Sequence, residues 1–507
     1  MKLRVSVVLL CASVLGVDAC SGGSSTAKPT SHHSAKPNIV FVLADDLDRG
    51  EIAYLPSVRK LIAERGMTLQ NQLVNDSLCC PSRTTMLRGQ YAHNSGVIAN
   101  SGPDGGFPSA FRRGIVDDTV GTWLQRAGYA TALYGKFLNG YPNPAGNTYE
   151  PAGWTDWAGA IDSPNAYGEF NYDVIHNRQR IHYGTEASDY GTDVYTNYAV
   201  DFARRNIATG TPFFAYVSYF APHQPATPAP RDASLFLTGV APRTAAFNEA
   251  DVSDKPSWVR SLPLLSHMVI DRIDSLYRER LRSLQAVDRG VRKLVDTLRQ
   301  ANVLDNTYFV FTSDNGFHLG EHRLAAGKRT PYESDIRVPF MVRGPGIGAG
   351  SSTSVLTGNV DLAETFAAIA NASTPSFEDG RSLLDLWHQR PSAAMSRSGY
   401  VLEHIPEPAV FASSDNDINA KTTSVLGSAE PANIPQYTAV RTATKLYVEY
   451  VNGEREYYDL VTDPNELSNR ASTMTIARQS AWSTYLHAMV NCAADTCRTA
   501  DATPEPT

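Results

Sequence analysis

Cysteine is scarce in this chain of 507 residues, which has only six, and charged residues make up just 19%. So few cysteines exclude a small disulfide scaffold, because such a scaffold needs a dense set of pairs. A formal net charge of -7 gives no reason to expect binding to nucleic acid or to anionic lipid. The length predicts one large α/β domain with insertions or two domains. No nucleic-acid partner is expected, and the site must indicate what binds.

The N-terminus has the pattern of an export signal. Lys2 and Arg4 precede an apolar run that is too short to span a bilayer as a permanent helix. We predict a signal peptide at 1–19 and a flexible tether at 20–36, which has few apolar residues to bury. Cys20 resembles a bacterial lipoprotein cleavage site, and ordinary cleavage after Ala19 is the alternative. The expected location is secreted or lipid-anchored at the bacterial cell surface, with membrane contact only through lipid on Cys20.

Strand-like apolar runs, each ending abruptly in polar residues, indicate the fold class. A helical pattern of apolar residues three and four apart covers 271–300. Continuous apolar strands alternating with helices predict an α/β fold, with a large, mostly parallel central sheet flanked by helices. The four runs lie at 38–46, 129–136, 212–223 and 306–315.

The sequence changes character beyond about residue 375. A loop-rich stretch precedes residues 437–464, which alternate like a hairpin with Asn452-Gly453 at its tip. We predict a catalytic domain at 37–375 and a C-terminal subdomain at 376–507 with a small antiparallel sheet. Cys492 and Cys497 are spaced for a short-loop disulfide in an exported protein.

Polar residues follow the predicted strands at the edge where parallel sheets bind ligands. Three carboxylates in one pocket repel one another and require a cation. Carboxylates and an amide carbonyl are hard oxygen ligands, which favour Ca²⁺, and less so Mg²⁺, over zinc. An isolated Asp-Asp pair is more often a solvated turn, but two acid groups at strand ends favour a metal site. The predicted ligands are Asp45, Asp46, Asp314 and Asn315.

Basic side chains come from the same predicted edge and its surroundings. Positive charge beside a bound dication is useful only if an anion binds there, and sulfate or phosphate esters are the candidates. Taken singly, the lysines could be surface residues and the histidine a loop residue; the set together favours a site. The residues are Arg83, Lys136, His223 and Lys328.

The adjacent pair Cys79-Cys80 is the remaining puzzle. Pro81 suits the first position of a helix, which would place Cys79 just before a helix N-terminus, where a thiolate is favoured. A thiolate is nevertheless a poor ligand for an oxygen-lined site for a hard metal ion. The mismatch indicates that Cys79 does not act as a cysteine.

The segment Cys79-Cys80-Pro81-Ser82-Arg83, followed by Leu87 and Gly89, resembles the signature of the type I sulfatases. The likeness extends from Pro37 to about Ser472 and includes Ala-Asp-Asp at 44–46, Ser-Asp-Asn-Gly at 313–316 and the segment 327–346. It implies that a formylglycine-generating maturation enzyme converts Cys79 to formylglycine. The hydrated aldehyde would then be nucleophile and metal ligand. Cys80 would be structural, and a disulfide between the two cysteines is the rival explanation.

The same resemblance implies roles for the other residues. Residue 79, Asp45, Asp46, Asp314 and Asn315 would hold Ca²⁺. Arg83 would steady the hydrated aldehyde, Lys136 and Lys328 would neutralise sulfate oxygens, and His223 would protonate the departing alcohol.

One position departs from the pattern. Many arylsulfatases carry a histidine where this chain has Leu138, so the base for sulfate elimination is open. Segments 135–139 and 182–194 resemble the N-acetylglucosamine-6-sulfatase branch, which implies a sulfated sugar or other small sulfate ester. His318 and His322 are candidate substrate-binding residues. Their spacing would also suit zinc on a helix, but Gly316 and Gly320 argue against a regular helix, and solvated loop histidines are the alternative.

Two other functions fit parts of this pattern. A phosphomonoester or phosphodiester hydrolase of the same superfold would use the same metal, lysines and histidine. A protein with unmodified Cys79 would be catalytically silent and would only bind sulfated glycans. A sulfatase is the function that accounts for the whole set of residues.

Overall fold

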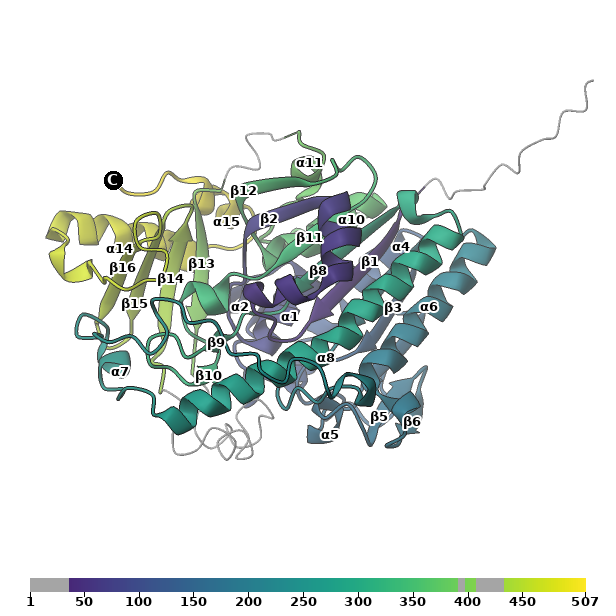
Figure 1. The fold of residues 1–507 in the computed structure, drawn as a ribbon. Coiled ribbons are helices and arrows are strands. Elements are labelled where there is room, and N and C mark those ends of the chain that lie inside the picture. Colours follow the sequence, from purple (N-terminus) through teal and green to yellow (C-terminus); the bar gives the residue numbers. More distant parts are fainter. Residues whose placement is uncertain (1–35, 391–396, 407–432) are drawn as a thin grey trace, which may run out of the picture. The chain divides into compact units, whose positions relative to one another are not determined.

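A computed structural model describes residues 36–390, 397–406 and 433–507, drawn as a ribbon in Figure 1. The predicted signal peptide at 1–19, Cys20 and the tether up to residue 35 lie outside these ranges. In the part of the chain that the structure describes, no helix combines the length and apolar character needed to cross a membrane.

The central element is a ten-stranded sheet with a parallel centre. Strands β8, β1, β7, β3 and β4 run parallel to one another, while β11, β5 and β6 run antiparallel to their neighbours. The four apolar runs in the sequence form β1, β3, β7 and β8, which are adjacent. In spatial order the strands are β12 (Ser351–Gly358), β2 (Met67–Leu73), β11 (Phe340–Arg343), β8 (Thr307–Ser313), β1 (Asn38–Ala44), β7 (Phe213–Ser218), β3 (Ala130–Gly135), β4 (Asp156–Ala160), β5 (Tyr172–His176) and β6 (Gln179–Tyr183).

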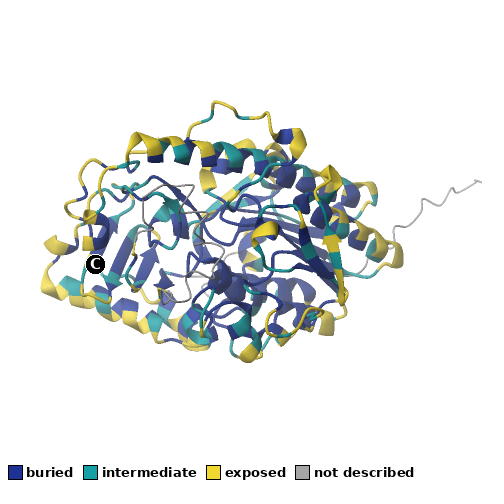
Figure 2. Cartoon of the chain, turned by 90° about the horizontal axis from the view of Figure 1, so that it is seen from below, coloured by how far each residue is buried: buried dark blue, intermediate teal, exposed yellow. Residues whose placement is uncertain are grey.

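Helices cover both faces of this sheet. The side chains of β1 alternate: Phe41 packs in one core with α4 (Val120–Arg126) and α10 (Leu362–Ala370), and Val42 packs in another with α6 (Gly191–Thr209) and α8 (His267–Gln300). Burial on both faces explains why these strands are apolar throughout. Figure 2 shows most strands as buried and the outer sides of the helices as exposed, and the edge strand β6 is exposed or half-buried along its length. The α/β fold with a mostly parallel sheet is therefore confirmed.

The predicted C-terminal hairpin belongs to a four-stranded antiparallel sheet. Its strands are β13 (Gly399–His404), β14 (Tyr437–Thr442), β15 (Lys445–Tyr450) and β16 (Arg455–Asp459), and Asn452-Gly453 lies in the turn between β15 and β16. β13 comes from the stretch predicted as loop-rich. The described residues from Lys36 onward belong to one compact unit, so the boundary at residue 375 stays a prediction.

Shorter helices complete the described fold. They are α1 (Cys79–Arg88), α2 (Ala92–Ser95), α3 (Gly106–Arg112), α5 (Pro164–Tyr167), α7 (Ser257–Arg260), α9 (Glu333–Ile336), α11 (Leu384–Trp387), α14 (Ile476–Val490) and α15 (Asp495–Ala502). The prediction that Pro81 is the first helical residue is wrong: α1 already begins at Cys79, and Pro81 is its third residue. Proline is still accommodated there, because the first-turn amides have no partner within a helix.

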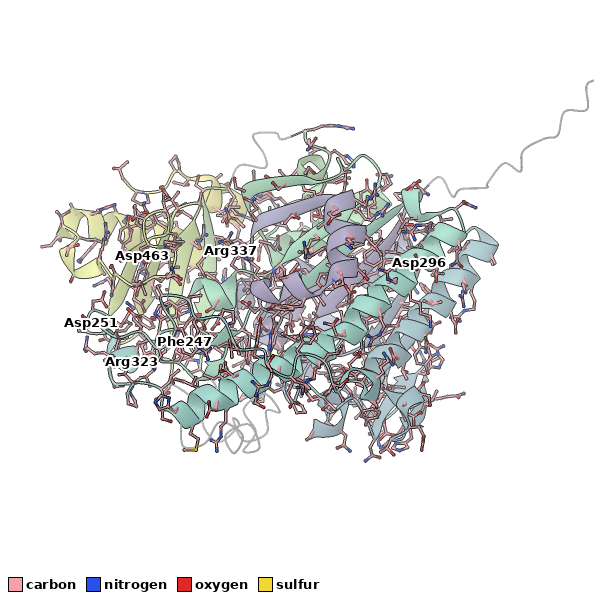
Figure 3. All side chains as sticks on the ribbon, viewed as in Figure 1. Phe247, Asp251, Asp296, Arg323, Arg337 and Asp463 are labelled. Carbon is pink, nitrogen blue, oxygen red and sulfur yellow. A yellow bond between two sulfur atoms is a disulfide. The ribbon has the colours of Figure 1, made fainter. Side chains whose placement is uncertain are left out.

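A long connection before α8 is fastened by one arginine. The guanidinium of Arg323, labelled in Figure 3, donates hydrogen bonds to the carbonyls of Glu249, Ala250 and Leu262. Arg323 lies in the turn that joins β9 (His318–Leu319) to β10 (Ala326–Gly327), the two strands of a short antiparallel ribbon. These bonds hold the connection against the ribbon that leads to Lys328.

Candidate active site

Two acid-bearing turns meet at the carboxyl ends of β1 and β8. The strands pair in parallel with Ala44 opposite Ser313, which brings the residues after them together. The Asp46 amide donates to Asp314 Oδ1 at 3.0 Å, and Asn315 Nδ2 donates to Asp46 Oδ1 at 2.7 Å. Asp46 has a left-handed backbone with φ 64°, which Asp tolerates better than most residues. Asp45, Asp46, Asp314 and Asn315 are all buried.

Cys79 faces this acidic turn from the first residue of α1. Its Sγ donates to Asp45 Oδ1 at 3.4 Å, and Lys328 Nζ donates to it at 2.8 Å. One ligand atom from each of Asp45, Asp46, Cys79 and His223 lies within 4.8 Å of the others. The side chain at position 79 therefore lies beside two of the predicted metal ligands, Asp45 and Asp46.

Cys80 has different surroundings although it is the next residue. Its side chain lies in the hydrophobic core, and its amide donates to Asn100 Oδ1 at 2.8 Å. Burial raises the pKa of the Cys80 thiol to about 12, so the thiol stays protonated. Neither Cys79 nor Cys80 is in a disulfide, so this structure contains no vicinal disulfide between them.

Arg83 ties four strand ends together. Its Nε donates to Asp314 Oδ2 at 2.8 Å after β8, and one Nη donates to the Lys136 carbonyl at 3.1 Å after β3 and to Ser218 Oγ at 2.7 Å on β7. Its other Nη lies 3.6 Å from Asp45 after β1. One turn of α1 separates Arg83 from Cys79, so these contacts also fix the position of residue 79.

Two lysines and a histidine complete the group. Lys136 Nζ donates to Asp45 Oδ2 at 2.5 Å, and Lys328 Nζ donates to Asp46 Oδ1 at 2.7 Å. His223 Nδ1 lies 2.6 Å from the Gln224 carbonyl, which fixes this nitrogen as the donor and leaves Nε2, 3.6 Å from Asp46 Oδ2, facing the site. The structure thus brings all nine predicted catalytic and metal residues together.

The carboxylates at this edge differ in charge environment. Burial, and then the neighbouring Asp314, raise the pKa of Asp45 to about 6. Burial would also raise the pKa of Asp314, but Arg83, then Lys136 and Lys328, outweigh it and hold that pKa below its usual value. Crowded, buried carboxylates of this kind are stabilised by nearby cations.

The donor atoms suit a hard dication. The carboxylate oxygens come from three aspartates, and Asn315 Oδ1 is buried without a hydrogen-bond partner among the described residues. An unpartnered buried amide oxygen is costly, and coordination to a metal ion would satisfy it. The three aspartates balance the charges of Arg83, Lys136 and Lys328, so a dication would leave the site positive and able to bind an anion.

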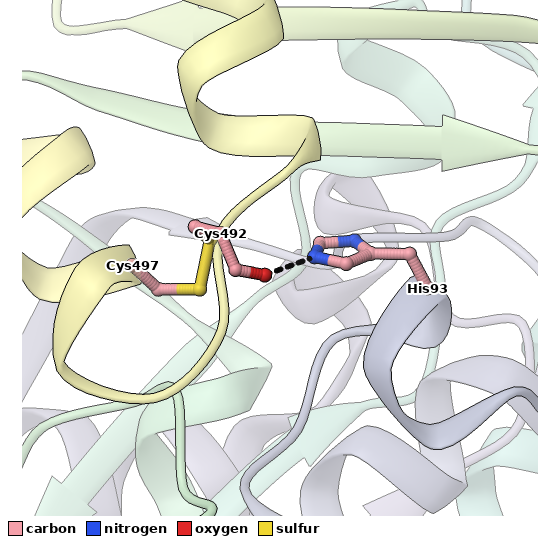
Figure 4. A group of neighbouring side chains, drawn as sticks. All are labelled: His93, Cys492 and Cys497. Atoms are coloured by element: carbon pink, nitrogen blue, oxygen red, sulfur yellow. Dashed lines mark hydrogen bonds between the residues drawn. A yellow bond between two sulfur atoms is a disulfide. The ribbon is translucent and has the colours of Figure 1, made fainter.

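A second group of potential metal ligands lies elsewhere in the structure. It contains His93 on α2 together with Cys492 and Cys497, which flank the connection from α14 to α15. The two cysteines form a disulfide, as predicted, and His93 Nε2 bonds to the Cys492 carbonyl at 3.1 Å (Figure 4). Sulfurs in a disulfide are not thiolate ligands, so this group has a structural role.

The two predicted substrate-binding histidines are each paired with an acid. His318 Nδ1 lies 3.0 Å from Asp335, and His322 Nδ1 lies 2.7 Å from Glu249. His318 is in the two-residue strand β9 and His322 follows it, so the expectation that no regular helix forms here is confirmed. Both side chains are buried, and their contact with substrate stays a prediction.

Sequence reasoning missed several buried polar residues around the site. Arg280 of α8 donates to the Asp46 carbonyl at 2.6 Å and pairs with Glu51, and its place on an otherwise apolar helix face was the available signal. Tyr167 of α5 contacts both Lys136 and His223. Ser82 donates to the Asp314 carbonyl, although the sequence alone marked it only as part of a motif.

Comparisons with known proteins agree with this geometry. A family model described as Sulfatase matches residues 37–372. An arylsulfatase of Volvox carteri is 35% identical, covering 95% of this chain and 79% of the relative. An N-acetylglucosamine-6-sulfatase of Capra hircus is 34% identical, covering 95% of this chain and 87% of the relative.

A solved structure shares the fold. It is described as a complex with its substrate D-glucosamine-2-N,6-O-disulfate. It aligns with a TM-score of 0.67 at 24% identity and covers 89% of this chain and 97% of its own.

Proposed function

This chain belongs to the sulfatase family and is a sulfuric ester hydrolase, and we propose that it cleaves a sulfate monoester with formylglycine at position 79 and a bound Ca²⁺. The observation that carries the proposal is the position of Cys79. Its side chain lies 3.4 Å from Asp45 and 2.8 Å from Lys328, at the start of a helix beside four strand ends. An oxygen-bearing side chain there would suit the hard donor set, which sulfur does not.

The proposed Ca²⁺ ligands are Asp45, Asp46, Asp314 and Asn315, with residue 79. Oxygen donors of this kind suit Ca²⁺, and Mg²⁺ less well because it keeps more of its water. The ion would supply positive charge that lowers the repulsion among the carboxylates and attracts the ester. Two arginines fix the turns that carry these ligands: Arg83 donates a hydrogen bond to the Asp314 carboxylate, and Arg280 donates one to the Asp46 carbonyl.

The hydrated aldehyde would supply the oxygen nucleophile that a thiol cannot. The Nζ atoms of Lys136 and Lys328 would donate hydrogen bonds to the non-bridging sulfate oxygens, because both already lie within 2.7 Å of the acidic turn that frames the site. His223 would act in its doubly protonated form: the Gln224 carbonyl accepts the proton on Nδ1, and the second proton, on Nε2, would go to the departing alcohol oxygen.

A sulfated sugar is the proposed natural substrate, with aryl sulfates as the alternative. The relative from Capra hircus is named for a 6-sulfated amino sugar, and the solved neighbour is described with a sulfated glucosamine. His318 and His322 are the proposed substrate-contacting residues, each oriented by its acidic partner.

Export and maturation are part of the proposal. The basic and apolar N-terminus supports a signal peptide, and the Cys492–Cys497 disulfide supports an oxidising compartment. We propose that the mature protein is secreted or held at the bacterial cell surface by lipid on Cys20. A formylglycine-generating enzyme would be its partner during maturation.

Two measurements test this function. The tryptic peptide with residue 79 should weigh about 18 Da less than its cysteine form, because a thiol becomes an aldehyde. The protein should turn over nitrophenyl sulfate well above nitrophenyl phosphate. An unshifted mass in material from a host with the maturation enzyme would favour a glycan-binding protein. A clear preference for phosphate would favour a phosphoester hydrolase.

A further inference from the structure

The ring of Tyr167 in α5 contacts two of the three polar side chains that are proposed to act on the ester, Lys136 and His223. Its ring centroid lies 4.7 Å from Lys136 Nζ and 4.6 Å from the His223 ring centroid. We infer that Tyr167 is a positioning residue, which holds Lys136 against the sulfate oxygens and His223 Nε2 toward the leaving alcohol. The inference rests on the proposed function and adds a residue that the sequence motifs did not identify.

The contact with Lys136 restricts a flexible side chain. Lysine has a four-carbon stem, and its ammonium is held on one side by Asp45 Oδ2 and on another by the Tyr167 ring. A cation over a buried aromatic face is attracted by the ring's quadrupole. Because Tyr167 is only 3% exposed, water does not compete well for this ammonium.

The contact with His223 restricts a ring rotation. The two rings are tilted by 54°, and the Gln224 carbonyl holds His223 Nδ1. Together they leave Nε2 facing Asp46 and the proposed leaving group. A proton donor contributes fully only when its atom is aligned with the oxygen that it protonates.

Tyr167 itself is held rigidly. Asn139 Nδ2 donates to its hydroxyl at 3.2 Å, and the Phe220 ring packs edge-on at 5.0 Å. The side chain of Ser163 caps α5 by accepting from the Ala166 amide. Each of these contacts fixes the ring between Lys136 and His223.

The role of Asn139 supports a functional reason for this arrangement. Its Oδ1 is buried without a hydrogen-bond partner among the described residues, which is unfavourable for the fold alone. Leu138, at the place where many arylsulfatases resembling this chain carry histidine, is buried in the apolar core. In the segment after Lys136, Leu138 is therefore directed into the core, and Asn139 reaches the site indirectly, through its hydrogen bond to Tyr167.

Leaving-group dependence tests the inference. A nitrophenolate leaves readily without a proton, whereas a sugar alkoxide requires one. For Tyr167→Leu in the full, matured protein, we expect kcat to fall about 100-fold on N-acetylglucosamine 6-sulfate and about 10-fold on nitrophenyl sulfate. Tyr167→Phe keeps the ring and should stay within about threefold on both substrates.

Matched variants distinguish a specific effect on the positions of Lys136 and His223 from a general loss of packing. Tyr172→Leu removes another buried tyrosine, which packs on Tyr183 and Tyr195. This variant should change kcat on the two substrates by the same factor. If Tyr167→Leu does not fold, Asn139→Leu serves instead. This variant removes the hydrogen bond to the Tyr167 hydroxyl but keeps the Tyr167 ring, and it should lower the ratio of kcat on the sugar sulfate to kcat on the aryl sulfate about threefold.

Three results would overturn the inference. The first is a loss of kcat that is equal on both substrates for Tyr167→Leu, or for Asn139→Leu where it is the substitute. The second is a loss of kcat in Tyr167→Phe as large as that in Tyr167→Leu. The third is a change in the sugar-to-aryl ratio of kcat in Tyr172→Leu as large as that in Tyr167→Leu. Wild-type protein with no activity on either sulfate would instead overturn the proposed function from which the inference starts.

Discussion

Cys79 and Cys492 each lie close to a histidine, yet their surroundings differ in charge and in oxidation state. Cys79 is not in a disulfide, and its sulfur contacts Asp45, Asp46 and Lys328. Cys492 is bonded to Cys497, and its carbonyl accepts a hydrogen bond from His93 Nε2. The same residue types thus form two different kinds of group.

The positions of the two groups in the fold explain the difference. The first lies at the carboxyl ends of adjacent parallel strands, where four turns present side chains to one point. The second joins helices α14 and α15 to α2, and its hydrogen bonds hold chain segments together. The residue types in a group therefore do not show whether it is a candidate catalytic site, as at Cys79, or a structural contact, as at Cys492.

Replacing Cys79 should have the largest effect. Cys79→Ala removes the proposed precursor of the nucleophile, so kcat on a sulfate ester should fall about 10⁴-fold or more. Cys80→Ala is the matched control. It removes a buried thiol from the core, so kcat should stay within about threefold while stability falls by about 1–2 kcal/mol. Comparable losses of kcat in both variants would contradict separate roles for the adjacent cysteines.

Removing one carboxylate at the sheet edge should abolish the response to calcium. Wild-type protein should gain about 2.7 kcal/mol of unfolding free energy at a Ca²⁺ concentration 100 times its Kd, measured against a chelator control. Asp314→Asn should show little of this gain, because it loses a ligand charge and the partner of Arg83.

Asp379→Asn provides the control from the second region. Asp379 is also buried, and it accepts hydrogen bonds from the Tyr91 and Ala494 amides beside the disulfide. This variant should be less stable but should keep the full calcium response. A calcium response that survives in Asp314→Asn would place the ion elsewhere.

The placement of the active-site strands could be predicted because buried parallel strands leave a clear pattern. The runs ending in Asp45, Lys136 and Asp314 are apolar on both faces and stop abruptly, so their ends mark one edge of the sheet. Tyr167 and Arg280 could not be assigned in this way. They reach the site from an insertion and from a helix face, and only long-range packing shows where they lie.

Reduction of the disulfide should have a moderate effect on stability and little on activity. Cys492 and Cys497 close a loop five residues apart, for which chain entropy gives about 2 kcal/mol. The double variant Cys492→Ser, Cys497→Ser should lose that amount in urea unfolding while kcat stays within about twofold. Wild-type protein treated with a dithiol should behave in the same way. A loss of kcat approaching that of Cys79→Ala would show that this link supports catalysis directly.

The C-terminal region illustrates what a local pattern misses. The hairpin at 437–464 was recognisable because it alternates and has an Asn-Gly turn, and β14, β15 and β16 form there. β13 lies in the stretch whose sequence is loop-rich, and it pairs with β14, which begins only at Tyr437. Glu403, the partner of His93, lies on β13, so this contact was not predictable either.

The smallest expected effect is a pH-dependent contribution from His93. Burial alone would lower its pKa, but the hydrogen bond from Nδ1 to Glu403 Oε1 at 2.8 Å raises the pKa above its usual value. A histidine with a raised pKa stabilises the fold below its unfolded pKa of about 6.5, and the contribution is lost as pH rises through the folded pKa. Wild type should therefore exceed His93→Gln in unfolding free energy by about 1 kcal/mol more at pH 5.5 than at pH 8.5.

Urea unfolding of both proteins at the two pH values measures this difference, and titrations common to both cancel in the comparison. Glu403→Gln is the matched control, because it removes the carboxylate that raises the pKa of His93 while keeping a hydrogen-bonding side chain. In that background, His93→Gln should have the same effect at both pH values. A wild-type advantage that grows with pH would mean that His93 is held neutral, and the second group would then be stabilised by the disulfide and the backbone contacts without an ion pair.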